Sequence, residues 1–291
     1  MPTMTRMPAA SNERLRKFAL VAAAPLLLFA VVLHILWGML AAGLLFPLLP
    51  LRGRDALVQL WSRGLLLLLG IRLELHCDAA ALAAVASRGA LLLCNHVSWV
   101  DVFAIAAVTP ARFVAKSEVA RWPVLGRFAG SVGTLFVERG RRHAVTHINH
   151  RVAARLRTGQ SIGIFPEGTT TDGSQLLRFH ANMVQAALAA NAPVIPVGLQ
   201  YRQNGQPTVQ AAFVGDMNLV ESLWRIAICS RLTVRLHWLA PIACEGLTRQ
   251  AIAALARTAI GQALELPEVI AVDEQTDSPP GRPLATASQL R

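Results

Sequence analysis

Acidic and aromatic residues are scarce in this chain of 291 residues. It has 17 Asp and Glu against 28 Lys and Arg, so its formal net charge is +11, and only 6% of its residues are aromatic, with one tyrosine. A basic chain suits nucleic acid, an anionic bilayer surface or an acidic carrier protein. Because no zinc-finger, helix-turn-helix or RNA-recognition signature is present, we expect no nucleic-acid partner.

Cysteine is scarce as well, and no two cysteines have C-x-x-C spacing. This excludes a disulfide framework and a cysteine-ligated metal site. We therefore expect the globular part to lie on the reduced, cytosolic side of a membrane. The four cysteines are Cys77, Cys94, Cys229 and Cys244.

Charged residues are absent from residues 18–49, a run longer than the ~20 residues that cross hydrocarbon as a helix. Pro25 and Pro47 interrupt this run, so a bent or re-entrant hairpin competes with one tilted span. A buried helix pair and a cleaved signal peptide fit it less well. Residues 61–70 add a second apolar patch. We expect a polar basic N-terminus over 1–17 and a membrane-associated helical segment over 18–70.

Beyond residue 70 the pattern alternates between short apolar strands and helical stretches, which predicts a layered α/β fold with a mixed sheet flanked by helices. We expect a catalytic domain over 71–267 and a disordered tail over 268–291. The strands are predicted at 71–77, 89–94, 134–138, 161–165, 193–199 and 232–239, and the helices at 78–86, 98–108, 117–128, 141–157, 181–190 and 248–264.

Polar residues gather where the apolar strand 90–94 ends, in the stretch "NHVSWVD" (95–101). One interpretation is a helix capping box, with Ser98 as N-cap and Asp101 three residues later. A second is a catalytic pair: an Asp101 carboxylate that reaches back to His96 would fix the imidazole tautomer and leave the other ring nitrogen as a base. Capping leaves His96 without a role.

A second polar turn, "FPEGTTTDG" (165–173), follows another short apolar strand. A glycine-flanked turn with hydroxyl side chains exposes backbone N–H groups to an anion. Glu167 is unusual in a pure phosphate site, which favours a contact with a hydroxyl or a basic neighbour. An ordinary turn into a helix remains an alternative for residues 170–173.

Several blocks in order along residues 90–200 resemble the glycerolipid acyltransferases, the lysophosphatidate acyltransferase group. The first is the N-H-x-x-x-x-D motif at 95–101. The others are "KSEV" (116–119) followed by "PVLG" (123–126), "GTLFVERG" (133–140), "FPEGT" (165–169) and "VIPVGL" (194–199).

The resemblance implies transfer of a fatty acyl group from an acyl carrier protein or coenzyme A thioester to a lysolipid hydroxyl. His96 would be the general base and Asp101 its orienting partner. It implies no cofactor beyond the acyl donor, no metal, and a catalytic domain on the cytoplasmic face of the inner membrane, in contact with membrane lipids. The residues implied to bind the acceptor head group are Arg139, Glu167, Gly168, Thr169 and Lys116.

The implied acceptor is 1-acyl-sn-glycerol-3-phosphate, giving phosphatidate. Two departures favour an alternative. Thr170 and Thr171 replace an Arg-Ser pair found in many lysophosphatidate members, and "LLRFHANM" (176–183) lacks a lysine-and-glycine pattern. The Thr-Thr form is more similar to lyso-ornithine lipid O-acyltransferases. A non-catalytic lipid-binding protein is a further alternative, disfavoured because His96 and Asp101 are both present.

Overall fold

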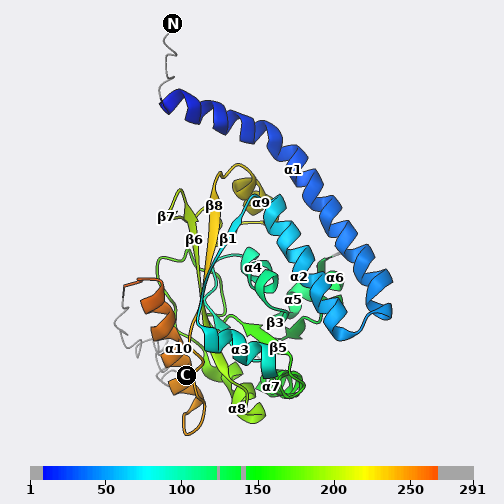
Figure 1. The fold of residues 1–291 in the computed structure, drawn as a ribbon, viewed down its shortest axis with the longest axis vertical. Helices are drawn as coiled ribbons and strands as arrows, with labels where there is room; N and C mark the ends of the chain where they lie inside the picture. Colours follow the sequence, from blue (N-terminus) through cyan, green and yellow to red (C-terminus); the bar gives the residue numbers. More distant parts are fainter. Residues whose placement is uncertain (1–8, 123–124, 139–141, 268–291) are drawn as a thin grey trace, which may run out of the picture.

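A mixed sheet runs through the centre of the molecule, and helices cover both of its faces (Figure 1). The computed structural model describes residues 9–122, 125–138 and 142–267. Within these residues the strand order is β1-β8-β6-β2-β5-β3-β4, and β7 pairs with β6. The strands are β1 (Arg72–Cys77), β2 (Leu91–Cys94), β3 (Ala111–Lys116), β4 (Leu135–Val137), β5 (Ser161–Ile164), β6 (Val194–Gln203), β7 (Gln206–Pro207) and β8 (Leu232–Trp238).

The five neighbouring strands β6, β2, β5, β3 and β4 are parallel, whereas β8 runs antiparallel to β6 and parallel to β1. Central parallel strands are buried on both faces, which suits a continuous apolar run such as that of β2. In β2, Leu92 and Cys94 join one buried cluster and Leu91 and Leu93 join the other. The carboxyl ends of these strands meet at one edge, where sites form in open α/β sheets.

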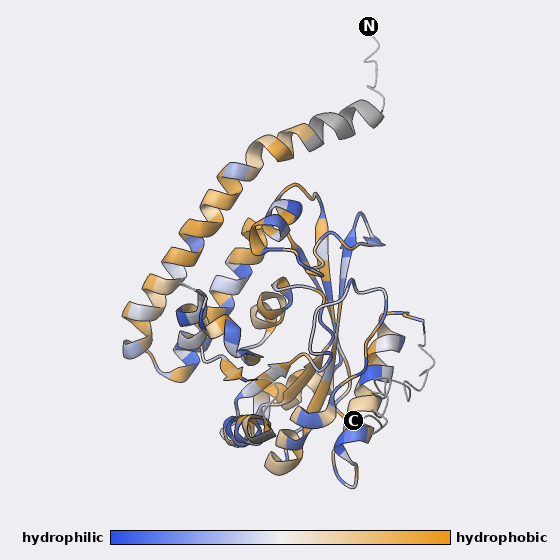
Figure 2. Cartoon of the chain, turned by 180° about the vertical axis from the view of Figure 1, so that it is seen from behind, coloured by the Kyte–Doolittle hydropathy of each residue, from blue (hydrophilic) through white to orange (hydrophobic). Residues whose placement is uncertain are grey.

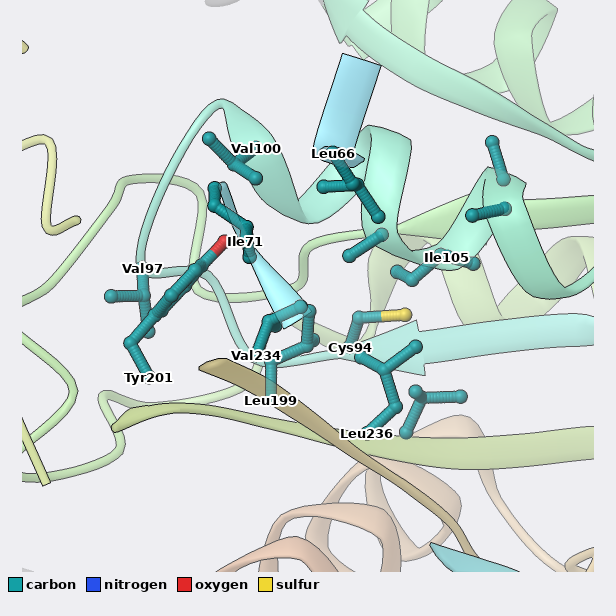
Figure 3. Packing of buried hydrophobic residues seen from close by; sticks show 14 of the residues in the cluster. Leu66, Ile71, Cys94, Val97, Val100, Ile105, Leu199, Tyr201, Val234 and Leu236 are labelled. Atoms are coloured by element: carbon teal, nitrogen blue, oxygen red, sulfur yellow. The ribbon is translucent and has the colours of Figure 1, made fainter. Parts of the chain in front are cut away.

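The helices divide between the two faces of the sheet. One apolar cluster packs residues of α2 and α4 against the sheet (Figure 3), and the other packs residues of α7, α8 and α10 against the opposite face. Side-chain caps begin several helices: Asp78 accepts from two backbone N–H groups of α3, and Thr248 accepts from one of α10. Beyond the two N-terminal helices given below, the α-helices are α3 (Ala79–Arg88), α4 (Val100–Val108), α5 (Ser117–Ala120), α6 (Leu125–Ser131), α7 (Arg142–Arg157), α8 (Gln185–Ala190), α9 (Leu219–Ala227) and α10 (Arg249–Ala263), with a 3-10 helix at Ala181–Val184.

The N-terminal apolar run forms one long helix, α1 (Ala9–Leu45), which continues through Pro25. A 3-10 turn (Phe46–Leu48) follows, and Pro50 precedes α2 (Leu51–Leu68), which lies between α1 and α4 (Figure 1). Among the described residues, one segment, Phe18–Leu48, is long and apolar enough to cross a membrane, and 11% of its most apolar window is buried. Most of the coloured length of α1 is hydrophobic in Figure 2.

A reciprocal contact joins α1 to α2. The Trp61 indole N–H donates to the His34 carbonyl (3.0 Å), His34 Nε2 lies 3.0 Å from the Trp61 carbonyl, and the two rings stack at 4.8 Å. Gly38 and Gly64 make room for these rings, because a Cβ at either position would lie within 3 Å of the partner's ring. Part of the second apolar patch, including Leu65 and Leu66, packs into the core rather than facing outward.

The expected fold class is confirmed: the sheet is mixed, helices flank it, and an apolar helix precedes it. Several elements differ from the sequence prediction. Strand β3 and helix α9 were not predicted. The helix expected over 117–128 is two short helices, α5 and α6, and the one expected from residue 98 begins at Val100. Residues 1–8 and the tail from 268 lie outside the described residues.

Candidate active site

The turn between β2 and α4 is fixed to the neighbouring strand β6 by a side chain. The Asn95 amide donates to the Leu199 carbonyl (3.0 Å), and the Leu199 N–H donates to Asn95 Oδ1 (2.7 Å). This pair of bonds imitates strand pairing one residue beyond the end of β2. Asn95 is therefore buried with both its amide nitrogen and its amide oxygen hydrogen-bonded, which fixes the position of the residue before His96.

His96 and Asp101 lie together, as the catalytic-pair hypothesis requires. His96 Nδ1 is 2.9 Å from Asp101 Oδ2, which also accepts from the backbone N–H groups of Val97 (2.7 Å) and Ser98 (2.9 Å). Asp101 is fully buried, and 20% of the His96 side chain is exposed. Because an ionised carboxylate only accepts, the hydrogen of the neutral imidazole sits on Nδ1, which leaves a lone pair on Nε2.

Part of the predicted capping box is also present. Ser98 Oγ accepts from the Val100 N–H (3.3 Å), while the Asp101 carboxylate accepts from the Ser98 N–H. The residue directly before α4 is Trp99, whose side chain makes no capping bond. The same carboxylate thus fixes the start of the helix and holds the imidazole, so the two interpretations of Asp101 coexist.

Aromatic rings stack against one face of the His96 imidazole. The His96 ring stacks on Phe165 with centroids 3.8 Å apart, and Phe165 stacks on Phe113 at 5.9 Å. Phe113 belongs to β3 and Phe165 follows β5, so two neighbouring strands position the stack. Gly163 is required beneath it, since a Cβ there would lie 2.5 Å from the Phe113 ring.

Glu167 lies behind His96 and is only 4% exposed. Its Oε1 accepts from the His96 N–H (2.8 Å) and its Oε2 from the Leu177 N–H (3.0 Å). Burial raises the pKa of this carboxyl, although the two backbone N–H groups act in the opposite direction. The Glu167 side chain therefore joins the two polar turns, and its oxygens are taken up by backbone donors. Contact of this carboxylate with a head group stays a prediction.

Gly168, Thr169 and Lys116 lie around the same edge of the sheet. Gly168 has a left-handed φ of 75°, which glycine adopts without strain, and Thr169 beside it is exposed. Lys116 is exposed at the end of β3, where it pairs in register with Val137 at the end of β4. Arg139, two residues further on, lies outside the described residues.

The two threonines that replace the Arg-Ser pair are tied to backbone groups. Thr170 Oγ1 donates to the Phe213 carbonyl, and the Thr171 N–H donates to the His96 carbonyl (2.8 Å). Neither supplies a positive charge. In the described ranges, no group of three or more His, Cys, Asp or Glu side chains is arranged to hold a metal ion.

An apolar cavity of about 300 Å³ lies beside this site, between the N-terminal helices and the sheet. Side chains from α1, α2, α4, α6 and β3 line it, among them Trp61, Phe103 and Phe113. Phe113 therefore faces the cavity and also stacks on the ring that supports His96. A cavity of this size is at the lower end of the ~300–1,000 Å³ of small-molecule sites.

Sequence reasoning missed three parts of the site: the cavity, the Phe165 stack and Tyr201. Tyr201 donates its hydroxyl to Asp101 Oδ1 (2.7 Å) from β6. The sequence could have indicated this residue. Tyr201 lies two residues beyond Leu199 in the same strand, and residues i and i+2 of a strand point to the same face. The cavity had no such signal, since its walls come from five separate elements.

Comparison with known proteins places these features in a family. The family model described as "Acyltransferase" matches residues 79–200. A lyso-ornithine lipid O-acyltransferase of Pseudomonas aeruginosa is 41% identical over 174 residues, which are 60% of this chain and 67% of that protein. A 1-acyl-sn-glycerol-3-phosphate acyltransferase of Neisseria meningitidis is 39% identical over 184 residues, 63% of this chain and 70% of that protein.

The fold has a counterpart among solved structures. The crystal structure of the 1-acyl-sn-glycerophosphate acyltransferase from Thermotoga maritima superposes with a TM-score of 0.64 at 18% identity, covering 86% of this chain and 96% of that one. At this identity the likeness speaks for the fold alone. Taken with the two relatives and the family model, the chain belongs to the acyltransferase family that contains the 1-acyl-sn-glycerol-3-phosphate and lyso-ornithine lipid acyltransferases.

Proposed function

We propose that this protein transfers a fatty acyl group from an acyl thioester to the free hydroxyl of a lysolipid, and that His96 and Asp101 carry the reaction. The observation behind the proposal is the hydrogen-bonded pair itself. The imidazole is partly exposed, one ring nitrogen is held by a buried carboxylate, and the other is free to accept a proton.

In this mechanism the lysolipid hydroxyl gives its proton to His96 Nε2 while its oxygen attacks the thioester carbonyl carbon. Asp101 stabilises the imidazolium that forms. The tetrahedral intermediate then expels the thiolate, which takes the proton from the imidazolium and leaves as the thiol. The new ester bond replaces the thioester bond, and His96 returns to its starting state. Because the thioester is already activated, the mechanism needs no enzyme nucleophile.

The acceptor that we propose is 1-acyl-sn-glycerol-3-phosphate. Lys116 supports it, because this exposed cation stands at the carboxyl end of β3, beside the end of β4 that leads to Arg139. Thr169 lies beside Gly168 in the turn after β5, where its exposed hydroxyl suits an anion. We propose all four, with Glu167 as their support, as the head-group site.

A second acceptor, lyso-ornithine lipid, is favoured by a specific observation. Thr170 and Thr171 are tied to the carbonyls of Phe213 and His96, so the positions of the Arg-Ser pair are filled here by groups that hold the turn and carry no charge. A head group with less negative charge than a phosphate monoester fits that change. Relatives of similar identity carry each of the two activities, so both acceptors are compared directly in the experiment below.

We further propose that residues 18–70 hold the catalytic domain, residues 71–267, on the cytoplasmic face of the inner membrane. The apolar surface of Phe18–Leu48 supports this placement. The cavity between these helices and the sheet then lies beside lipid, and we propose that it receives an acyl chain. Phe113 would bring the chain close to His96, because it links the cavity to the ring stack.

Purified full-length protein in lipid vesicles tests the proposal. Labelled acyl-coenzyme A and acyl-carrier protein are each offered with 1-acyl-sn-glycerol-3-phosphate, lyso-ornithine lipid and a lysophosphatidylcholine control. His96→Ala should lower the rate by about 10²–10⁴-fold, the usual contribution of a general base. His150→Ala, an exposed histidine of α7, is the matched control and should keep the wild-type rate.

The outcomes separate the alternatives. Transfer to the phosphate acceptor alone supports the first assignment, and transfer to lyso-ornithine lipid alone replaces it with the second. Binding of lysolipid without any transfer by wild-type protein would favour the non-catalytic lipid-binding alternative. A His96→Ala variant that transfers acyl groups at the wild-type rate would refute the proposed role of the imidazole.

A further inference from the structure

Tyr201 is the one tyrosine of the chain, and its hydroxyl bonds to the carboxylate that holds His96. The distance from the phenol oxygen to Asp101 Oδ1 is 2.7 Å. The side chain is buried at 2% exposure, in the cluster that also contains Val97, Val100 and Val234 (Figure 3). A tyrosine hydroxyl placed this deep needs a partner, and the partner is Asp101.

The two oxygens of Asp101 have different partners. Oδ2 accepts from His96 Nδ1 and from two backbone N–H groups of the turn, whereas Oδ1 accepts from the Tyr201 hydroxyl. The terminal torsion of an aspartate is broad and nearly two-fold, so a carboxylate held by one oxygen alone can turn about its axis. A donor on Oδ1 removes this freedom and keeps the Oδ2 lone pair directed at the imidazole.

Hydrogen bonds to the backbone fix the part of β6 that carries Tyr201 relative to the turn that carries His96. Asn95 binds both backbone groups of Leu199, and Tyr201 stands two residues further along β6, on the same face of the strand. The turn that carries His96 and the strand that carries Tyr201 are thus joined before the phenol reaches Asp101. Burial, followed by the charge of Asp101, raises the pKa of the Tyr201 phenol well above its ordinary value, so the hydroxyl stays protonated.

We infer that Tyr201 is a positioning residue for acyl transfer: its hydroxyl fixes the plane of the Asp101 carboxylate and through it the orientation of His96. The inference rests on the proposed function, because it assigns a role within that reaction. Tyr201 touches neither the lysolipid nor the thioester in this account. Its loss should therefore lower kcat and leave the KM values for both substrates near those of the wild type.

Tyr201→Phe tests this with the smallest possible change, since it removes the hydroxyl and keeps the ring. We expect kcat per folded molecule to fall by about 10-fold or more, within the ~10²–10⁴-fold that a general base contributes in full. Val234→Ala is the matched control. Val234 pairs with Tyr201 across β6 and β8 and is fully buried, so its truncation loosens the same packing without touching the hydrogen bond.

The kinetic outcomes are decisive when the wild-type protein is active. A kcat that falls in Tyr201→Phe but not in Val234→Ala supports the inference. Equal kcat values for Tyr201→Phe and wild type, or equal losses in the two variants, would overturn it. An inactive wild-type protein would instead refute the proposed function, so the two failures are distinguishable.

A spectroscopic test needs no turnover and leaves the phenol hydroxyl of residue 201 in place. Growth on 3-fluorotyrosine labels position 201 alone, because the chain has one tyrosine, and gives a single fluorine resonance. Asp101→Asn should move this resonance, since it replaces the charged acceptor of the phenol hydroxyl. Glu74→Gln, which neutralises a carboxylate of β1 paired with Arg235, is the control and should leave it in place. A resonance that ignores Asp101→Asn would show that the phenol is not bound to that carboxylate.

Discussion

Asp101→Asn separates the two interpretations of the polar turn, because capping and catalysis predict different losses. The substitution keeps the size of the side chain and removes its charge. The two backbone N–H groups of Val97 and Ser98 can only donate, so the amide oxygen should take the place of Oδ2. That oxygen then also faces His96 Nδ1, and the imidazole keeps its tautomer.

The magnitude follows from the bonds that lose their charge. A hydrogen bond to a charged group contributes about 1.5–3 kcal/mol and a neutral one about 0.5–1.5 kcal/mol. Each of the three bonds to Oδ2, and the Tyr201 bond to Oδ1, is therefore weakened by about 1 kcal/mol. The released cost of burying a charge offsets part of this sum. We expect the free energy of unfolding to fall by about 1–3 kcal/mol.

The kinetic effect should be larger than the change in folded population. In the serine protease triad, the Asp-to-Asn change that inverts the tautomer costs about 10⁴-fold in kcat. Here the tautomer is kept and only the charge that stabilises the imidazolium is lost, so we expect a loss of about 10²-fold per folded molecule. Chemical denaturation gives the stability, and acyl transfer normalised to the folded fraction gives kcat.

Asp78→Ala is the control, since Asp78 caps α3 with two backbone bonds after β1, at the edge of the sheet opposite the site. It should cost about 1 kcal/mol of stability and leave kcat unchanged. If Asp101→Asn behaves in the same way, with lower stability and normal turnover, Asp101 is a capping residue and the catalytic reasoning is refuted.

Two further substitutions test the support of the imidazole. Gly163→Ala places a Cβ 2.5 Å from the Phe113 ring, so it should shift the ring stack that supports His96 and lower kcat. Gly261→Ala is the control, because its Cβ would lie 3.7 Å from the nearest atom and should leave kcat unchanged. Equal kcat values in the two variants would contradict the role of the stack. Glu167→Gln tests the buried carboxyl, whose pKa is raised by burial above its ordinary value of about 4.5. Because the folded protein holds this proton more tightly than the unfolded chain, wild-type stability should fall relative to Glu167→Gln as pH rises from about 4.5 through the raised value. Denaturation of both proteins at several pH values checks this, and a pH-independent difference would exclude it.

The contacts predicted from sequence were the local ones. His96 and Asp101 are five residues apart at the end of an apolar strand, so the turn and the first helical turn were enough to bring them together. Strand β3 was missed because Arg112 and Lys116 interrupt its apolar pattern. Arg112 is nevertheless buried, since Asp55 of α2 pairs with it at 2.5 Å. The ion pair between Arg112 and Asp55 thus allows a charged residue inside a buried strand, which the local sequence pattern does not indicate.

The same distinction explains why the acceptor is harder to read than the reaction. His96 and Asp101 are brought together by one short turn. The proposed head-group residues that the structure describes, Lys116, Gly168 and Thr169, come instead from the end of β3 and the turn after β5. Glu167 illustrates the difference: its motif suggests a ligand contact, yet its two oxygens receive N–H groups from His96 and Leu177. A motif residue of this kind can persist because it holds the base in place, whatever head group the neighbouring turns accept. The reaction class therefore follows from the first block, and the acceptor follows from which cations surround it.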